Sequence, residues 1–301
     1  MCIRDRFSPD GELEIRVGIQ CHGQGTETSL AQIAHEVLGL YIASIKIVHG
    51  DTALSPYSTG TWGSRVIVMA GGAVARACEE LAARLCKIGA HLMQSKVSDT
   101  YIENGMVKTP ARQISIQEVS QTWYRRPQDL PNDVDPGGLE VTAGYKMERD
   151  DGTFSYAAHA VVVSIDPELG NVDLMKYVIV EDGGKLINPM IVDGQIHGGI
   201  AQGVAQALWE SGEYNESGQL VSGSMMDYAI PRTDCLPSFE LDRTVTPSPT
   251  NPLGVKGVGE TGTIASTPAV VNAVMDALSP FGVTHLDMPL TSQKIWNAIQ
   301  S

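Results

Sequence analysis

Alternating apolar and polar residues near the start of the chain predict a β-strand. The alternation covers residues 13–19, after a Pro-Asp-Gly turn, and a period of two places the apolar side chains on one face of a sheet. A helical pattern follows over residues 30–38, where apolar residues recur three and four positions apart up to Gly39. The segment between these two elements is rich in glycine, so we expect a tight loop there.

Similar patterns along the rest of the chain predict further helices and strands. Residues 70–88 carry a helical pattern, and two β-rich runs flank the turn residues 167–170, which predicts a hairpin. The arrangement of a strand, a loop with glycine and glutamine, and a helix is predicted twice, around Gln24 and around Gln195, which suggests an internal duplication. Strands and helices alternate without the regular rhythm of a parallel sheet, so the prediction is an α+β fold.

These patterns divide the chain into four segments. Residues 1–6 lack a hydrophobic period and join abruptly to a predicted central strand, so we interpret them as a scar of cloning or sequence assembly. Residues 7–96 form the predicted first part of the protein, and residues 156–301 form the second part. Between them, residues 97–155 are weakly patterned and contain several prolines and a Gly-Gly pair, which predicts a linker or a segment that faces a partner.

Composition and charge narrow the functional classes. With 301 residues, 43% of them hydrophobic, the chain has the size and composition of a globular protein. Its formal net charge of −14 and its lack of clustered Lys and Arg argue against nucleic-acid binding. No apolar run approaches the roughly 18 residues of a membrane helix. The five cysteines are scattered without a C-x-x-C pair, and no signal peptide is recognisable, so we expect reduced thiols in the cytoplasm.

Residues 254–263, GVKGVGETGT, contain glycines at the G-x-G-x-x-G spacing of a dinucleotide-binding turn. Such a turn follows a hydrophobic strand and precedes an acidic residue about 20 positions further on. Here a proline-rich stretch precedes the glycines, and Asp276 lies within the next predicted helix. The alternative is that the glycines admit a bulky ligand while Glu260 faces it. A carboxylate among Gly, Val and Thr would be partly desolvated, and a raised pKa would suit a general base; an ordinary surface glutamate is the remaining interpretation.

Other polar groups in the predicted loops favour the binding of a cofactor. Gln24 and Gln195 each offer hydrogen-bond donors and an acceptor without charge. The loop at Gly63, Ser64 and Arg65 offers backbone N–H groups, a hydroxyl and a guanidinium, which suit a phosphate or pyrophosphate. The seven histidines show no metal-ligand spacing, so no set of protein ligands for a metal is predicted.

Four segments together resemble the large molybdopterin-binding subunit of the molybdenum hydroxylases, the family of xanthine oxidase, aldehyde oxidase and aerobic carbon monoxide dehydrogenase. The segments are HGQGTET, GTWGSR, INPMIVDGQIHGGIAQG and NPLGVKGVGETGTIASTPAVVNAV. The resemblance runs from about Asp10 to the C-terminus and corresponds to roughly the last two-fifths of a family chain. It therefore implies that the loop that selects the substrate lies outside this sequence and that the fragment alone is inactive.

The resemblance implies roles for individual residues. Glu260 is implied to be the catalytic base, which removes a proton so that an oxygen from water is inserted into an aldehyde, an N-heterocycle or a CO-like substrate. The residues implied to bind the cofactor are Gly23, Gln24, Gly25, Gly63, Ser64, Arg65, Gln195 and Gly259. Gln24 is implied to lie beside the molybdenum, which the pterin holds without a direct protein ligand.

The resemblance also implies cofactors and partners. The cofactor is molybdopterin, as the cytosine dinucleotide, with molybdenum; the partners are an iron–sulfur subunit with 2Fe–2S clusters and an FAD-binding subunit, in a dimer of heterotrimers. The chain departs from the family at Thr26, Val66 and Gly183, where His, Ser and Cys are common, and the last two changes remove hydrogen bonds that the cofactor would accept or donate. Two alternatives stay open: a related aromatic acyl-thioester reductase, and a non-catalytic assembly module with a decayed cofactor pocket.

Overall fold

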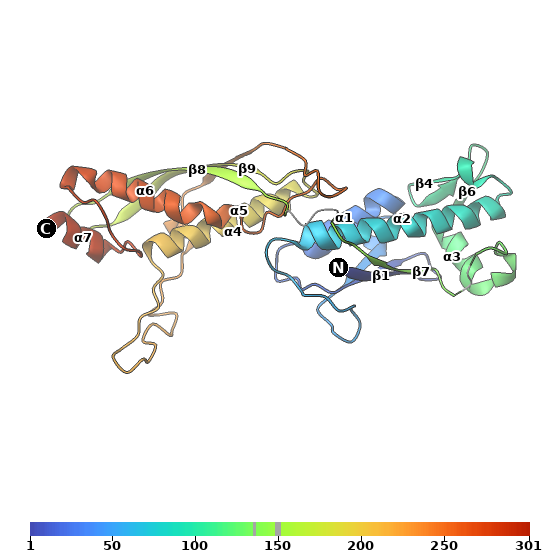
Figure 1. Ribbon diagram of the computed structural model, residues 1–301, viewed down its shortest axis with the longest axis horizontal. Coiled ribbons are helices and arrows are strands. Elements are labelled where there is room, and N and C mark those ends of the chain that lie inside the picture. The colour runs from blue at the N-terminus through green and yellow to red at the C-terminus, as the bar shows by residue number, and fades with distance from the viewer. Residues whose placement is uncertain (135–136, 148–151) are drawn as a thin grey trace. The chain divides into compact units, whose positions relative to one another are not determined.

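The computed structural model describes residues 1–134, 137–147 and 152–301. These residues form two compact units. Unit 1 comprises Met1–Thr153 and Ser248–Lys256, and unit 2 comprises Phe154–Pro247 and Gly257–Ser301. Both units combine helices with β-sheets (Figure 1), which confirms the predicted α+β class. None of the helices described is long and apolar enough to span a membrane.

Unit 1 is built on a four-stranded sheet with the strand order β3-β2-β1-β7. Its strands and helices are β1 (Cys2–Phe7), β2 (Leu13–Val17), α1 (Thr26–Leu38), β3 (Ile45–Val48), α2 (Val66–Leu92), β4 (Tyr101–Glu103), β5 (Met106–Lys108), β6 (Gln113–Ser115), α3 (Ile116–Arg125) and β7 (Glu140–Gly144). Short 3₁₀ helices cover Ile42–Ser44, Val97–Asp99 and Pro127–Asp129. Strands β2 and β3 are parallel, and the other neighbours are antiparallel. The alternation predicted for β2 is confirmed, and α1 ends as predicted before Gly39, whose φ of 63° favours glycine at a helix end.

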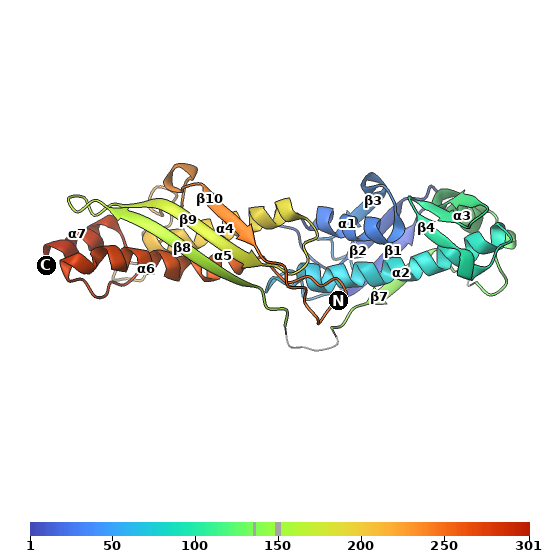
Figure 2. The same ribbon diagram turned by 90° about the horizontal axis from the view of Figure 1, so that it is seen from above.

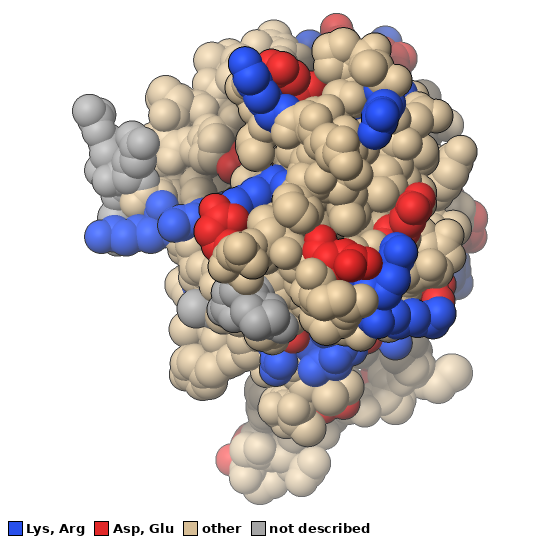
Figure 3. Space-filling view, turned by 90° about the vertical axis from the view of Figure 1, so that its right-hand side faces the viewer, with Lys and Arg blue, Asp and Glu red and all other residues tan. Residues whose placement is uncertain are grey.

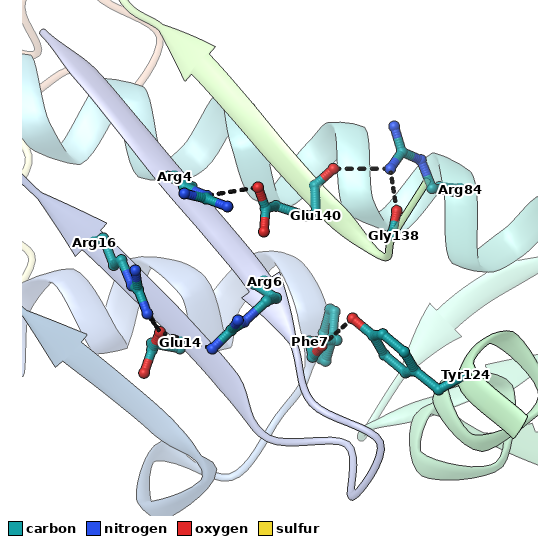
Figure 4. Close-up of polar contacts among 9 residues, drawn as sticks. All are labelled: Arg4, Arg6, Phe7, Glu14, Arg16, Arg84, Tyr124, Gly138 and Glu140. Atoms are coloured by element: carbon teal, nitrogen blue, oxygen red, sulfur yellow. Dashed lines mark hydrogen bonds and ion pairs between the residues drawn. The ribbon is translucent and has the colours of Figure 1, made fainter. Parts of the chain in front are cut away.

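The first residues of the chain form strand β1 and do not lie outside the domain. This strand pairs with both β2 and β7. Arg4 Nε donates to Glu140 Oε1 on β7 at 2.5 Å, and the hydroxyl of Tyr124 on α3 donates to the carbonyl of Phe7 at 2.8 Å (Figure 4). The domain boundary predicted between residues 6 and 7 is therefore wrong, whereas the interpretation of residues 1–6 as a scar stays a prediction.

Asp5 explains why residues 1–6 show no hydrophobic period. Ile3 and Phe7 are fully buried, and Asp5 between them is fully buried as well, with its Oδ2 4.0 Å from the Cys78 sulfur on α2. The other carboxyl oxygen of Asp5 has no hydrogen-bond partner among the described residues. Burial raises the pKa of Asp5 to about 8. An acidic residue thus occupies an interior position of the sheet where the pattern calls for an apolar one.

Replacing Asp5 with valine is expected to stabilise the folded chain by about 2 kcal/mol at pH 7, because an incompletely hydrogen-bonded buried carboxyl group is removed. Since folding raises the pKa of Asp5, the stability that the Asp5 proton contributes is fully present below about pH 4 and is lost as the pH rises through about 8. Urea unfolding should therefore show a larger gain for Asp5→Val at pH 8 than at pH 5. An equal gain at both pH values would show that proton binding by Asp5 is not linked to folding.

Residues 97–134 and 137–144 belong to unit 1 and carry several of its helices and strands, so the linker predicted for residues 97–155 is wrong over that part. Strands β4, β5 and β6 form an antiparallel sheet, and β7 joins the main sheet of unit 1. Val107, Val119 and Trp123 are buried, and a Cβ added at Gly89 of α2 would lie 2.5 Å from Val107 Cγ1. Three-residue strands are too short for a periodic pattern to reveal. Acidic and basic side chains are interspersed on this end of unit 1 (Figure 3), and its role in facing a partner stays a prediction.

Unit 2 consists of a three-stranded sheet with the order β10-β9-β8 and helices on one of its faces (Figures 1 and 2). Its strands and helices are β8 (Tyr156–Ile165), β9 (Val172–Asp182), α4 (Pro189–Leu208), β10 (Phe239–Arg243), α5 (Thr261–Ile264), α6 (Ser266–Leu278) and α7 (Ser292–Gln300), with 3₁₀ helices at Thr233–Cys235 and Ser279–Phe281. Strands β8 and β9 form the hairpin predicted around residues 167–170. Tyr177 and Ile179 of β9 are buried against apolar residues of α4 and α6, so one face of the sheet carries the core.

Helix α4 begins earlier than the glycine pattern predicts. Asn188 caps it, because its Oδ1 accepts a hydrogen bond from the backbone N–H of Ile191 at 3.1 Å, and Pro189 follows at the first helical position. Gln195 therefore lies inside a helix, whereas Gln24 lies in a loop before one. The predicted repetition of strand, glycine-and-glutamine loop and helix is wrong for the second copy.

Candidate functional site

The loop that follows β2 holds the first group of candidate residues in unit 1. Gly23 and Gly25 adopt φ angles of 110° and 72°, which favour glycine, and α1 begins directly after Gly25. Gln24 Oε1 accepts a hydrogen bond from the His22 N–H at 2.7 Å, and Gln24 Nε2 donates to the Gln20 carbonyl at 3.2 Å. These two bonds orient the side-chain amide and leave it one further N–H and one further lone pair for a ligand.

The second loop of unit 1 leads into the long helix α2. Gly63 and Ser64 have φ angles of 57° and 54°, so successive backbone N–H groups turn just before the helix. The Arg65 guanidinium donates to Thr59 Oγ1 at 2.7 Å and stacks over the Trp62 ring at 5.0 Å. A turned backbone, a hydroxyl and an oriented guanidinium at a helix N-terminus have the chemistry of an anion site.

Hydrogen bonds join these two loops to each other. The Gln20 N–H donates to Thr61 Oγ1 at 2.9 Å, and the Thr61 hydroxyl donates to the Gln20 carbonyl at 2.7 Å. The same carbonyl receives the Gln24 side chain. Unit 1 therefore brings together its two groups of candidate residues, 23–25 and 63–65.

Unit 2 holds the remaining candidates where α5 crosses α4. Gln195 is half-buried on α4, and Glu260 is exposed and directly precedes α5. Gly262 packs on α4 so closely that an added Cβ would lie 2.5 Å from the Ile196 carbonyl oxygen and 3.2 Å from Gly199 Cα. Because Ile196 follows Gln195 directly, this crossing brings the segments of Gln195 and Glu260 together.

The conformation of the turn at Glu260 is fixed by its neighbours. The Thr261 N–H donates to the Val258 carbonyl at 3.3 Å, and the buried Thr261 hydroxyl lies 2.8 Å from the Ser155 hydroxyl. Gly259 is exposed beside Glu260. The predicted desolvation of Glu260 is not found within this chain, because the side chain is exposed, and the glycine at 262 serves helix packing rather than leaving room for a ligand.

The glycine-rich motif crosses from one unit to the other. Ser248–Lys256 belongs to unit 1, and unit 2 resumes at Gly257. In the first segment, Asn251 closes a tight turn: its Nδ2 donates to the Val255 carbonyl at 2.9 Å, and its Oδ1 accepts from the Val255 N–H at 3.2 Å. From Ser248 onward, the proline-rich segment before the glycines therefore belongs to unit 1. The predicted second part, residues 156–301, did not set this segment apart.

A buried ionic group near the start of α4 was not predicted from the sequence. Glu181, 2% exposed at the end of β9, faces Arg243 Nε at 3.8 Å, and Arg243 also pairs with Asp193 on α4. Burial raises the pKa of Glu181, and the nearby carboxyl groups of Asp182 and Asp193 reinforce the rise against the opposing charge of Arg243. The only sequence signal is the pair of acidic residues at the end of an apolar strand.

Gly183, one of the departures from the resembled family, has a packing reason. A Cβ added there would lie 2.6 Å from Val258 Cγ1 and 3.0 Å from Leu186 Cδ2. Asp182 beside it accepts hydrogen bonds from the Gly184 N–H at 2.9 Å and from the Tyr156 hydroxyl at 3.0 Å. A cysteine at position 183 would require the Val258 side chain to shift.

The donor chemistry of these residues fits a large anionic cofactor held by hydrogen bonds. The candidate set contains side-chain amides, a hydroxyl, a guanidinium and the backbone groups of several glycines. It contains no thiol or imidazole that would bind a metal directly. Space is open beside four glycines of the candidate segments, because a Cβ added to any of them would have no atom within 4 Å: Gly23, Gly63, Gly194 and Gly198. A ligand can therefore approach the backbone closely at these positions.

Comparisons with known proteins agree with this chemistry. Residues 3–237 match the family described as "Molybdopterin cofactor-binding domain". The chain is 39% identical over 296 residues to the nicotine 6-hydroxylase large subunit of Paenarthrobacter nicotinovorans and 35% identical over 295 residues to the carbon monoxide dehydrogenase large chain of Hydrogenophaga pseudoflava, covering 97% and 98% of this chain. It spans 36% of the length of each of these curated relatives.

Solved structures give the same result for the fold. The crystal structure of quinoline 2-oxidoreductase from Pseudomonas putida 86 matches 99% of this chain with a TM-score of 0.91 and 37% identity, over 38% of its own length. A structure of the Cu,Mo-CO dehydrogenase in its carbon monoxide reduced state matches 99% of the chain with a TM-score of 0.90 and 32% identity, over 37% of its length. The similarity therefore extends over both units.

Proposed function

The chain belongs to the molybdopterin cofactor-binding domain family, in the large subunits of molybdenum hydroxylases. We propose that it supplies residues that bind the cofactor, and the catalytic base, of such an oxidoreductase. The proposed reaction inserts an oxygen from water into an aldehyde, an N-heterocycle or a CO-like substrate. The observation that carries this proposal is Glu260, an exposed carboxylate held at the crossing of α5 and α4 by the packing of Gly262.

Each unit contains residues that we propose to bind the cofactor. In unit 1, Arg65 and the turned backbone at Ser64 would receive phosphate oxygens, and Gln24 would present its remaining N–H to an oxo group. In unit 2, Gln195 would donate to the pterin, and Gly259 would allow close approach beside Glu260. When bound, the molybdenum cofactor supplies the two-electron redox centre of the reaction.

Glu260 is the proposed general base. An exposed carboxylate accepts a proton at either oxygen, and the neighbouring Thr261 and Gly262 are packed, so its backbone is held in place. Any desolvation of this carboxylate comes from the cofactor, the substrate or residues outside this chain.

Further features of the whole enzyme follow from family membership as proposals. The relatives named above include a nicotine hydroxylase and a carbon monoxide dehydrogenase, which supports an N-heterocycle or a CO-like molecule as substrate beside the aldehyde that is also proposed. We propose molybdopterin cytosine dinucleotide as the form of the cofactor, an iron–sulfur subunit and an FAD-binding subunit as partners, a dimer of these heterotrimers, and a cytoplasmic location.

Replacing Arg65 with methionine in the full-length protein is expected to lower cofactor affinity about 10- to 100-fold, because a charge-assisted hydrogen bond to phosphate is worth roughly 1.5–3 kcal/mol. The measurement is the molybdenum and pterin content per protein after gel filtration. Arg125→Met, at an exposed position on α3, is the matched control and should leave the content unchanged. Equal cofactor content in Arg65→Met and wild type would remove Arg65 from the proposed site.

A further inference from the structure

Cys21, Glu27 and His49 form a cluster in unit 1 that the proposed reaction does not use. One potential ligand atom from each side chain, a sulfur, a carboxylate oxygen and an imidazole nitrogen, lies within 4.8 Å of the other two. The three residues come from the loop after β2, the first turn of α1 and the residue after β3, and these elements are neighbours in the fold (Figure 2). Three different ligand types thus converge from three separate segments.

The environment of the cluster suits ionised ligands. His49 Nε2 lies 2.7 Å from Glu27 Oε1, with 13% of the His49 side chain and 62% of the Glu27 side chain exposed. His49 Nδ1 is buried and has no hydrogen-bond partner among the described residues. Burial opposes ionisation of the Cys21 thiol, but hydrogen bonds from the backbone of Gly23 and Thr26 to the sulfur hold its pKa below the usual range.

We propose that Cys21, Glu27 and His49 bind a divalent metal ion of the zinc type, with water as a fourth ligand. Zinc takes thiolate, imidazole and carboxylate ligands in tetrahedral sites, whereas Mg²⁺ and Ca²⁺ require oxygen ligands. Bonds of about 2.0–2.3 Å place tetrahedral ligand atoms about 3.3–3.8 Å apart. The His49–Glu27 pair, whose Nε2 and Oε1 lie 2.7 Å apart, must open by roughly 0.6 Å to admit the ion, and the remaining separations, which are at most 4.8 Å, must come within this range. Rotation of the exposed Glu27 side chain can supply these adjustments.

A metal at this position would join three segments of unit 1. It would tie the loop of residues 20–25 to α1 and to the end of β3. That loop also carries Gln24, which is hydrogen-bonded to His22 directly after Cys21. Cys21 shares its loop with the proposed cofactor residues Gly23 and Gln24, but zinc binding requires neither Glu260 nor the pterin.

Zinc binding to the purified full-length protein tests this proposal. After treatment with a chelator, the protein is given Zn²⁺, passed through gel filtration and assayed for zinc. Wild type is expected to retain zinc in equimolar amount, and Cys21→Ser and His49→Gln are expected to bind it at least about tenfold more weakly. Cys235→Ser, a half-buried thiol in unit 2, is the matched control and should bind zinc like wild type.

A second measurement keeps the proposal testable if a variant fails to fold. Wild type loaded with Co²⁺ should show the near-ultraviolet absorption of a thiolate–cobalt bond, and Cys235→Ser should show it too. Failure of wild type to retain zinc, absence of the thiolate–cobalt band, or equal zinc binding by wild type, Cys21→Ser and His49→Gln would each overturn the proposal and leave a hydrogen-bonded His–Glu pair. None of these outcomes depends on turnover or on molybdenum content.

Discussion

Glu260→Gln in the full-length enzyme is expected to lower turnover about 100-fold or more, because glutamine keeps the shape of the side chain but cannot accept the proton. The exposed position of Glu260 and the packing of its neighbours predict that the fold survives the change. Molybdenum and pterin content should therefore equal those of wild type. The assay compares turnover per bound molybdenum, with the reduction of an artificial electron acceptor as the readout.

The matched control for this experiment is Glu216→Gln, which removes an exposed carboxylate in the same unit without touching α4 or α5. Its turnover should match that of wild type. If Glu260→Gln kept turnover within a few-fold of wild type at equal molybdenum content, Glu260 would not be the base. Loss of molybdenum together with turnover would instead assign Glu260 to cofactor binding.

Gly262→Ala is expected to destabilise unit 2 by about 3 kcal/mol, since even one methyl group overpacks the crossing of α5 and α4. Its Cβ would lie 2.5 Å from the Ile196 carbonyl oxygen and 3.1 Å from Ile196 Cα, and backbone atoms of a packed helix cannot move aside as a side chain can. The free energy of unfolding, from urea titrations followed by circular dichroism, measures this effect.

Gly198→Ala on α4 is the control, because an added Cβ at Gly198 meets no atom within 4 Å. Alanine in an exposed helical position stabilises a helix by roughly 0.5–1 kcal/mol relative to glycine. The two glycine-to-alanine changes should therefore shift stability in opposite directions. Equal effects would mean that the close contact at Gly262 does not hold the two helices together.

Local patterns predicted the parts of the fold in which one face of an element is buried. The alternation in β2, the helix α1 up to Gly39 and the β8–β9 hairpin are confirmed because each has a regular apolar period and a clear stop or turn. Patterns failed where the period was interrupted. Asp5 interrupts the row of buried apolar residues in β1, so the sequence shows no alternation there. The strands β4 to β6, with three residues each, are too short to show a period.

The glycines of α4 misled the prediction for a different reason. Glycine in a sequence usually indicates a loop, but Gly194 and Gly198, which marked the predicted loop, lie inside a helix, and a Cβ added at either meets no atom within 4 Å. The close approach of α5 and α6 instead explains the neighbouring Gly199, which faces Gly262, and Gly203, which faces Ser266. Such a requirement is set by tertiary packing and leaves no periodic signal in α4 itself.

The chemistry of the predicted loops singled out Gln24, Arg65, Gln195 and Glu260, and motif resemblance assigned them to one cofactor, but local patterns do not show which of them lie close together. Gln24 and Arg65 lie on two loops joined through Gln20 and Thr61, a contact between segments about 40 positions apart that has no signature in either loop. The pairing of Glu181 with Arg243 and the convergence of Cys21 on His49 are likewise long-range contacts. Spacing rules detect ligands that share a helix or a turn, and these residues share neither.

The proposed binding of the cofactor is best tested by molybdenum and pterin analysis of the purified full-length protein. Equimolar molybdenum and pterin per chain are expected, with a reduced content in Arg65→Met and an undiminished content in Glu260→Gln. A stably folded wild-type protein that contains neither molybdenum nor pterin, when produced in cells that synthesise the cofactor, would instead indicate a non-catalytic assembly module.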